Sequence, residues 1–159
     1  GVLFRKASEQ KIRQTLLEMD LLEAVIGLGA NIFYGTQLAA CVLVFKQQKV
    51  AEKQNKVLFI DASDQIRVGR AQNFLDKEHV QQIFDWYSSY TDVENYVKVV
   101  DMHQIKENDF YLNIPLYIDK VIEDNLPSVD EAMAQLKSAW KESQQADEYF
   151  KTKLAKYIA

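Results

Sequence analysis

The chain has 159 residues, 48% of them hydrophobic and 26% charged, with a formal net charge of -4. This composition is ordinary for a globular domain, and the acidic balance argues against a free-standing DNA-binding protein, which would usually be basic. The single cysteine excludes an intrachain disulfide, and no apolar run reaches the roughly 20 residues that span a bilayer. We therefore expect a cytoplasmic protein with no membrane contact.

The N-terminal segment begins abruptly with apolar residues at positions 1–4, which we interpret as the cut end of a larger domain or a processed fragment. Ser8 is a suitable N-cap for a helix, and Ile12, Leu16 and Met19 recur at spacings of four and three. The spacing predicts that these three side chains share the apolar face of that helix.

Three apolar runs predict strands. Residues 21–28 and 38–45 are apolar at nearly every position, and residues 57–61 have strong β propensity. Runs of this kind favour central strands that helices cover on both faces, so Cys41 is expected to be a small buried hydrophobe. The polar stretch 46–56 is expected to be a mobile excursion.

The connections carry the polar residues that could have a function. Residues 29–36 contain two glycines and an asparagine, and they are numerous enough for a functional loop. Residues 64–75 contain Arg67 and Arg70, the candidate DNA contacts, because arginine in a glycine-containing loop can pair with phosphate. Such a loop is more often simply exposed to solvent, so both interpretations stay open.

The middle of the chain predicts another helix, capped by Asp76, and a short strand at residues 96–100. Asp101 and Gln104 have the spacing of a capping box that opens one or two helical turns. The expected buried face of the helix after Asp76 consists of Val80, Ile83, Phe84 and Tyr87.

The last element is a long helix that begins with a capping box at Ser128 and Glu131. At the standard rise it would be roughly 45 Å long, which is too long and too polar for burial in so small a domain. We predict an arm that binds a partner, and a broken helix that folds back on its own domain is the alternative. Its apolar stripe consists of Val129, Met133, Leu136, Trp140, Phe150, Leu154 and Tyr157.

A self-contained active site is missing from the sequence. His79 and His103 are far apart, and neither has a second ligand at metal-binding spacing. Gly27 and Gly29 form half of a dinucleotide-binding fingerprint, but Ile32 occupies the third glycine position. We therefore assign no catalytic, cofactor-binding or metal-binding residue.

Several segments, taken in order, resemble the late part of the methyltransferase domain in the modification (M) subunit of type I restriction–modification systems. They include residues 69–75 and the run 105–119, and the most specific are residues 31–36 together with residues 108–117. The chain departs from the family at Tyr111 and Leu116, where Asn and Arg are common. The family-signature residues present here are Asn31, Phe33, Gly35, Thr36, Asn108, Asp109, Asn113, Pro115 and Tyr117.

The resemblance implies a Rossmann-like α/β fold and transfer of a methyl group from S-adenosylmethionine to the N6 amine of adenine in DNA. The family binds cofactor and flipped base through an early acidic Gly-containing motif and an Asn-Pro-Pro-aromatic motif, and neither is in this sequence. We therefore expect no bound cofactor and no activity from the chain alone.

The resemblance also implies two parts. Residues 1–119 would form the C-terminal portion of the methyltransferase domain, a mixed sheet with an antiparallel strand pair. Residues 120–159 would form a helical tail that contacts the specificity subunit. The restriction subunit and DNA would join in the assembled complex.

Two other hypotheses remain. The chain could be a stand-alone interaction module that uses its helical arm, without catalysis, or a small DNA-binding domain that works through Arg67 and Arg70. If the chain is instead a methyltransferase fragment, the missing half would leave an exposed apolar sheet edge, which is a liability, so self-association of the chain is expected.

Overall fold

The fold is built around a mixed sheet, which a computed structural model describes together with the rest of residues 2–120 and 127–158. Among these residues the sheet has four strands in the order β2-β1-β3-β4. The chain divides into two units, Gly1–Val121 and Ile122–Ala159, and the sheet belongs to the first. The strands are β1 (Leu22–Leu28), β2 (Cys41–Phe45), β3 (Lys56–Ala62) and β4 (Val97–Asp101).

The pairing of the strands confirms the predicted mixed sheet. The two inner strands, β1 and β3, run parallel, while β2 is antiparallel to β1 and β4 is antiparallel to β3. Parallel neighbours need a crossover, whereas antiparallel neighbours do not. The inner strands are fully covered, with Val25 and Phe59 both at 0% exposure.

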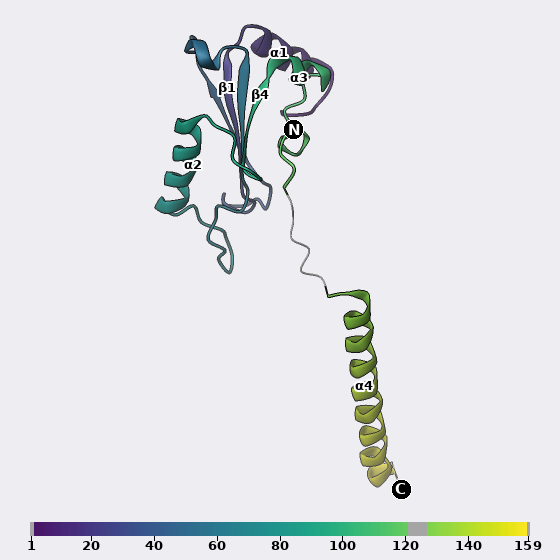
Figure 1. The fold of residues 1–159 in the computed structure, drawn as a ribbon. Helices are drawn as coiled ribbons and strands as arrows, with labels where there is room; N and C mark the ends of the chain where they lie inside the picture. The colour runs from purple at the N-terminus through teal and green to yellow at the C-terminus, as the bar shows by residue number, and fades with distance from the viewer. Residues whose placement is uncertain (1, 121–126, 159) are drawn as a thin grey trace. The chain divides into compact units, whose positions relative to one another are not determined.

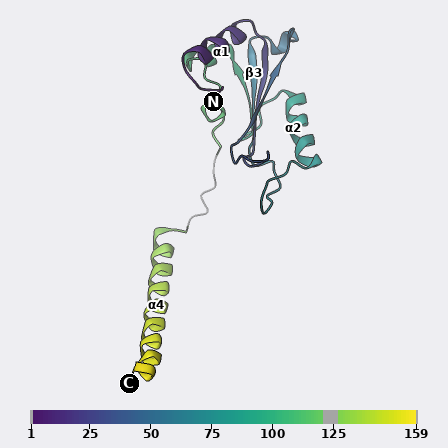
Figure 2. The ribbon, with the colours of Figure 1, turned by 180° about the vertical axis from the view of Figure 1, so that it is seen from behind.

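Helices cover both faces of this sheet. On one face lie α1 (Ser8–Glu18), α3 (Met102–Glu107) and the short 3-10 helix η2 (Ile114–Leu116), and on the other lies α2 (Lys77–Ser89) (Figures 1 and 2). Buried apolar residues form a cluster on each face, so the sheet is the middle layer of three. This α/β architecture agrees with the predicted fold class.

The prediction for β2 was wrong in one respect. The strand exists, but it is at the edge of the sheet, and Val42 and Phe45 are 45% and 49% exposed. Cys41 is likewise partly exposed rather than buried. An apolar run shows that a strand belongs in a core, but it does not show whether the described residues supply the cover.

The predicted apolar face of α1 exists, but it is not the buried face of the helix. Arg13 and Leu17 are its buried residues, whereas Ile12 and Met19 are 58% and 62% exposed. Ser8 does not cap this helix, because Ala7 is the N-cap residue and makes no side-chain cap bond. The expected apolar side chains therefore share a stripe that the described residues leave largely uncovered.

The predictions for α2 and α3 were correct only in part. In α2, Ile83 is buried as predicted, but Val80 and Phe84 are 52% and 58% exposed. Asp76 caps this helix in a capping box with His79, as expected for the Asp. Asp101 precedes α3 without a side-chain cap bond, so the predicted capping box there was wrong.

Residues 46–56 are tied to the sheet instead of forming the expected mobile excursion. They contain the 3-10 helix η1 (Ala51–Lys53). The Lys49 side chain is buried, and its Nζ donates to Asp20 Oδ1 at 2.6 Å and to the Lys56 carbonyl at 2.7 Å. A polar sequence can thus be ordered when its charges find buried partners.

The second unit contains α4 (Val129–Ile158), a helix of 30 residues. The predicted capping box is confirmed: the Ser128 amide donates to Glu131 Oε2 at 2.8 Å, and the Glu131 amide donates to Ser128 Oγ at 3.3 Å. No helix in the described part of the chain is both long and apolar enough to cross a membrane.

Candidate functional site

The candidate site lies where the two parallel strands end. Open α/β sheets bind ligands beyond the carboxyl ends of their strands. Here β1 and β3 end at Leu28 and Ala62, and the connections that follow them are bonded to each other. The Asn73 amide donates to the Asn31 carbonyl at 2.8 Å, and Gln72 Nε2 donates to the Ile32 carbonyl at 2.7 Å.

Asn31 is a structural member of this loop pair. Its backbone is left-handed, with φ of 57°, a conformation that Asn tolerates better than most residues. Its side-chain Nδ2 donates to the Ala71 carbonyl at 3.3 Å. The structure therefore brings the signature loop 29–36 and the arginine-containing loop 64–75 together, a juxtaposition that the sequence did not reveal.

The other signature residues of the first loop divide into two kinds. Thr36 Oγ1 accepts a hydrogen bond from the Leu38 amide at 3.1 Å, and Gly35 has a φ of 74° that favours glycine, so both shape the backbone. Phe33 and its neighbour Tyr34 are 54% and 94% exposed. The loop pair thus presents aromatic side chains to solvent.

The two candidate DNA-contact arginines differ. Arg67 Nε and Nη2 donate to the Asp76 carboxylate at 2.7 and 3.3 Å, and its guanidinium lies 4.5 Å from the Phe74 ring centroid. The hydrogen bonds with Asp76 raise the pKa of Arg67, and the same bonds lower the pKa of Asp76. Arg67 thus connects the loop to Asp76 although its side chain is 55% exposed, and Arg70 is exposed as well.

The signature run 105–119 packs against the face of the sheet that carries α1. Asn108 Nδ2 donates to the Gln104 carbonyl at 3.0 Å, and Asp109 turns the chain in a left-handed conformation with φ of 52°. Asn113 precedes η2, which contains Pro115, and its carbonyl accepts the Leu116 amide at 3.0 Å. These residues satisfy local backbone groups, as expected for a structural segment.

Tyr117 and Ile114 attach this run to the sheet. The Tyr117 ring lies 4.3 Å from the Phe59 ring, and its hydroxyl donates to the Tyr111 carbonyl at 2.6 Å. Burial raises the pKa of Tyr117 to about 12. Gly27 of β1 makes room for Ile114, since a Cβ there would come within 2.6 Å of Ile114 Cδ1.

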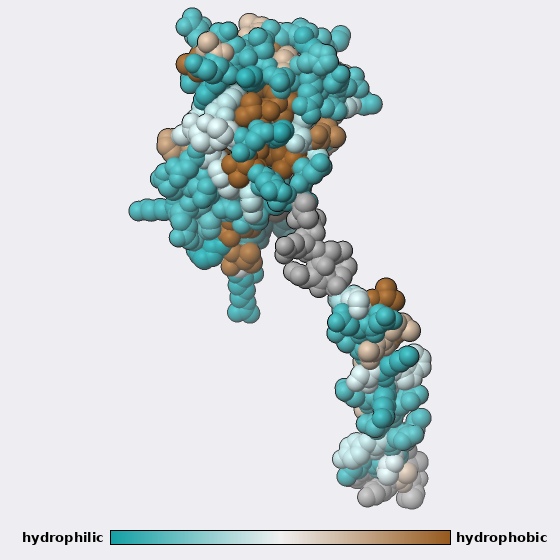
Figure 3. Space-filling view, in the orientation of Figure 1, coloured by the Kyte–Doolittle hydropathy of each residue, from teal (hydrophilic) through white to brown (hydrophobic). Residues whose placement is uncertain are grey.

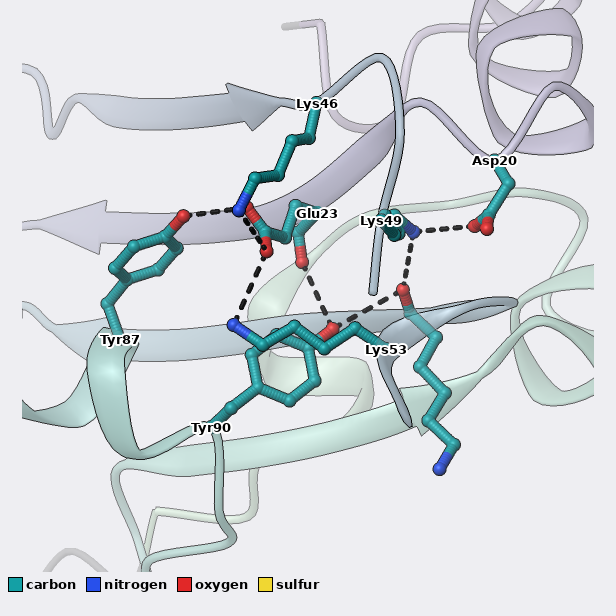
Figure 4. A network of polar contacts seen from close by, with 8 residues as sticks. Asp20, Glu23, Lys46, Lys49, Lys53, Tyr87 and Tyr90 are labelled. Atoms are coloured by element: carbon teal, nitrogen blue, oxygen red, sulfur yellow. Dashed lines mark hydrogen bonds and ion pairs between the residues drawn. The ribbon is translucent and has the colours of Figure 1, made fainter. Parts of the chain in front are cut away.

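A buried polar network surrounds Glu23, and it was not predicted from the sequence (Figure 4). Glu23 of β1 has 0% exposure, and its Oε2 accepts a hydrogen bond from the Tyr87 hydroxyl at 2.6 Å. The Nζ atoms of Lys46 and Lys53 both lie 3.4 Å from its Oε1. Lys53 Nζ also lies 4.2 Å from the Tyr90 ring centroid, a cation–π contact.

The network holds a charged carboxylate inside the protein. Burial would raise the pKa of Glu23, but the hydrogen bond from Tyr87 and the charge of Lys53 outweigh it, so its pKa is lowered. Burial and the neighbouring carboxylate raise the pKa of Tyr87 to about 12. The contacts join β1, α2 and residues 46–53, which gives the network a structural role.

The predicted partner-binding stripe lies on α4, where hydrophobic side chains recur between hydrophilic ones (Figure 3). Met133, Leu136 and Trp140 are 48%, 57% and 65% exposed. Val129, Phe150 and Leu154 are exposed as well, and the side chain of Tyr157 falls outside the described residues. An exposed apolar stripe of this length is typical of a helix that binds a partner.

Comparison with known proteins identifies the family of the chain. The family model for N-6 DNA methylases matches residues 1–125. The type I restriction enzyme MjaVII methylase subunit of Methanocaldococcus jannaschii is 37% identical over 126 residues, which are 77% of this chain and 22% of that protein. The chain therefore belongs to the N-6 DNA methylase family, and the predicted resemblance to type I methyltransferase subunits is confirmed.

Solved structures agree in fold. The type I restriction–modification methyltransferase subunit from Streptococcus thermophilus matches with a TM-score of 0.70 and 39% identity, covering 75% of this chain and 25% of that one. A structure from work on complex assembly of the type I system matches with a TM-score of 0.56 over 94% of this chain and 33% of that one, at 17% identity. The chain spans about a quarter of the curated relatives, 22% and 24% of the first two.

Two apolar grooves among the described residues offer few hydrogen-bonding partners for S-adenosylmethionine. A cofactor with an adenine and an amino-acid group needs hydrogen-bonding partners in its pocket. Two grooves, of about 250 and 350 Å³, are lined by apolar side chains, with Glu9 and Arg13 as the only charged residues in the first and none in the second. The described His, Cys, Asp and Glu side chains also form no group that could hold a metal ion.

Proposed function

We propose that this chain is the partner-binding end of a type I DNA adenine methyltransferase subunit. Residues 1–119 complete the methyltransferase domain, and residues 120–159 form a tail that docks on the specificity subunit. The parent protein transfers a methyl group from S-adenosylmethionine to adenine N6 in DNA. The restriction subunit and DNA join in the assembled complex, which would work in the cytoplasm.

The proposal is supported by the exposed apolar side chains of α4. Its 30 residues begin with a complete capping box, so the helix has a defined start. Its apolar side chains, among them Leu136 and Trp140, remain exposed. Such an amphipathic helix binds by laying its apolar stripe into a groove or against other helices.

The test is binding of the full chain to the specificity subunit of its own system, measured by calorimetry. Leu136→Glu should weaken binding at least tenfold, because it puts a charge into the apolar stripe. Lys137→Glu, at the adjacent position, is the matched control and should change binding less than threefold. Equal binding by the chain and the Leu136→Glu variant would refute the role of α4.

The inactivity of the chain alone is a separate part of the proposal. The groove lining described above supports it, since the first groove offers only Glu9 and Arg13 as charged partners and the second offers none. Titration of the chain with S-adenosylmethionine should release no binding heat. Tight binding would show that the cofactor-binding half is present.

The alternative is an interaction module that uses α4 without belonging to a methylating subunit. Both functions need the exposed stripe, so binding alone does not separate them. Determination of the gene sequence upstream of the codon for Gly1 does: an in-frame methyltransferase start supports the proposal, and its absence supports the module.

A further inference from the structure

The apolar stripe of α4 is interrupted in its middle. It consists of two apolar blocks, at positions 129–140 and 150–157, whose members recur in alternating steps of four and three residues. Between the blocks the same repeat falls on Ser143 and Asp147, which we call the polar interval. Alternating steps of this kind form the heptad pattern of a coiled coil, in which the repeated positions face the partner helix. A partner that covers both blocks therefore also covers the polar interval.

The Asp147 carboxylate has no cation beside it. The residue is exposed, and none of the ion pairs among the described residues involves it. Lys151 lies one turn further along the helix without pairing with it, and Lys153 Nζ lies 5.3 Å from the Tyr149 ring centroid. Water stabilises a carboxylate on an exposed helix. The charge is thus available to whatever covers the stripe.

Basic residues are absent around the polar interval. Residues 142–148 contain three carboxylates and neither Lys nor Arg. Lysines lie on both sides of this stretch, among them those at positions 137, 141, 151 and 153. The middle of α4 therefore carries a negative charge, which complements a basic segment of a partner.

Docking would remove the Asp147 carboxylate from water. The neighbouring members of the stripe include Trp140 and Phe150, which are 65% and 62% exposed and would be covered at the same time. A carboxylate in such apolar surroundings is strongly unfavourable unless a cation pairs with it and donates hydrogen bonds to it. A wholly apolar partner surface would therefore oppose docking at this point, whereas a basic side chain would favour it.

We propose that Asp147 forms an ion pair with an arginine of the partner helix, and that this pair sets the register in which α4 docks. The proposal rests on the proposed function, in which the partner is the specificity subunit. A guanidinium can bind both carboxylate oxygens and still have N–H donors left. Ser143 lies one turn before Asp147 on the same face, so its hydroxyl oxygen can accept one of these donors. The polar interval thus suits arginine better than lysine.

The single pair determines the register because the apolar blocks alone do not. Two apolar heptad patterns tolerate a shift by one repeat, about 10 Å along the helix, since apolar residues then meet other apolar residues. A shift of that size would separate the arginine from Asp147 and leave two unpaired charges in an apolar interface. The unfavourable desolvation of both charges selects the register in which they meet.

A second copy of α4 fits the polar interval less well. In a parallel pair each Asp147 would face the same carboxylate of the other helix, and like charges repel. In an antiparallel pair Asp147 would face Ser143 of the other copy, which provides a hydrogen bond but no cation. Both arrangements leave two carboxylates without a cation in an apolar interface. Self-association through α4 is therefore the competing outcome of the test.

The test is calorimetric titration of the full chain with the specificity subunit of its own system. Asp147→Leu makes the apolar stripe continuous, and its effect has opposite signs in the two cases. Opposite an arginine, the leucine leaves that cation buried and unpaired, so binding should weaken by about tenfold or more. Opposite an apolar surface, the leucine should tighten binding. Leucine also favours the helix more than aspartate does, so weaker binding would not reflect a loss of helix.

Two further variants provide the controls. Glu148→Leu is the same kind of change at the adjacent position, which lies off the stripe, and should alter binding by less than about threefold. Asp147→Asn keeps the shape of the side chain and removes its charge. It should weaken binding and make it less sensitive to salt, because the charged pair is lost. Equal binding by the Asp147→Asn variant and the unchanged chain would overturn the ion pair.

A charge swap identifies the partner residue. Asp147→Arg should abolish binding, because it places two cations opposite each other in the interface. Replacement of one arginine of the specificity subunit by Asp should restore binding to this variant. Failure of every such replacement to restore binding would overturn the pairing.

The remaining outcomes separate the ion pair from the proposed function. If the unchanged chain binds and Asp147→Leu binds equally or more tightly, the proposed function stands and the pairing is overturned. If the unchanged chain sediments as a dimer that Asp147→Leu strengthens, a second copy covers the stripe and the pairing is again overturned. If neither the unchanged chain nor any variant binds the specificity subunit, the proposed function fails and the pairing fails with it.

Discussion

The Glu23 network provides the sharpest stability prediction. Tyr87→Phe removes the hydroxyl that donates to Glu23 Oε2 at 2.6 Å and leaves that oxygen of a fully buried carboxylate unpaired. Hydrogen bonds to charged groups contribute about 1.5–3 kcal/mol. Lys46 and Lys53 contact the other oxygen and remain, so we expect a loss of about 2 kcal/mol in the free energy of unfolding.

The effect depends on pH at both ends of the range. The folded pKa of Glu23 is lowered, so its contribution is present above its unfolded pKa and is lost as the pH falls through the folded value. The folded pKa of Tyr87 is raised from 10.0 to about 12, so its contribution is present below pH 10 and is lost as the pH rises toward 12. Tyr87→Phe should reduce the alkaline decline, and the part that comes from Tyr117, whose pKa is also raised to about 12, should remain.

The measurement is urea denaturation followed by tryptophan fluorescence. The chain has two tryptophans, so Trp140→Phe in all samples leaves Trp86 of α2 as the reporter of the first unit. Tyr34→Phe is the matched control, since Tyr34 is 94% exposed, and should change stability by less than about 0.5 kcal/mol. If Tyr87→Phe costs no more than the control, the network does not stabilise the fold.

Three further predictions concern the core, acid stability and α4. Phe59→Ala, at 0% exposure, should lower the free energy of unfolding by about 3–5 kcal/mol in urea; a loss below 1 kcal/mol would contradict this burial. Glu23→Gln should flatten the decline in stability below about pH 4, measured by thermal unfolding at several pH values, and an unchanged profile would exclude Glu23 as its source. Ser128→Ala should destabilise the first turn of α4 by about 1 kcal/mol, seen as faster amide exchange near Glu131, whereas Ser138→Ala inside the helix should not.

Much of the fold could be predicted because the strands are apolar runs of the right length. The runs around β1 and β3 placed the inner strands correctly, and Ser128 with Glu131 placed the start of α4. Local chemistry determines these features. The α1 and α2 periodicities correctly identified apolar stripes, but Ile12 and Phe84 are exposed, because what covers a stripe is decided by distant residues.

The candidate site was less predictable. Arg67 looked available for phosphate, but Asp76, nine residues away, binds it. Glu23 had one detectable indication, a charge inside an otherwise apolar strand, which usually means a buried partner. Its partners Tyr87 and Lys53 lie 64 and 30 positions away, and no local pattern reveals contacts of that range.

Asp76 has a consequence for regulation, because one carboxylate serves two elements. It binds Arg67 of the loop and also caps α2 together with His79. A phosphate that captured Arg67 would change the electrostatic field at the first turn of α2. One side chain, Asp76, therefore fixes both the position of Arg67 in the loop and the first turn of α2.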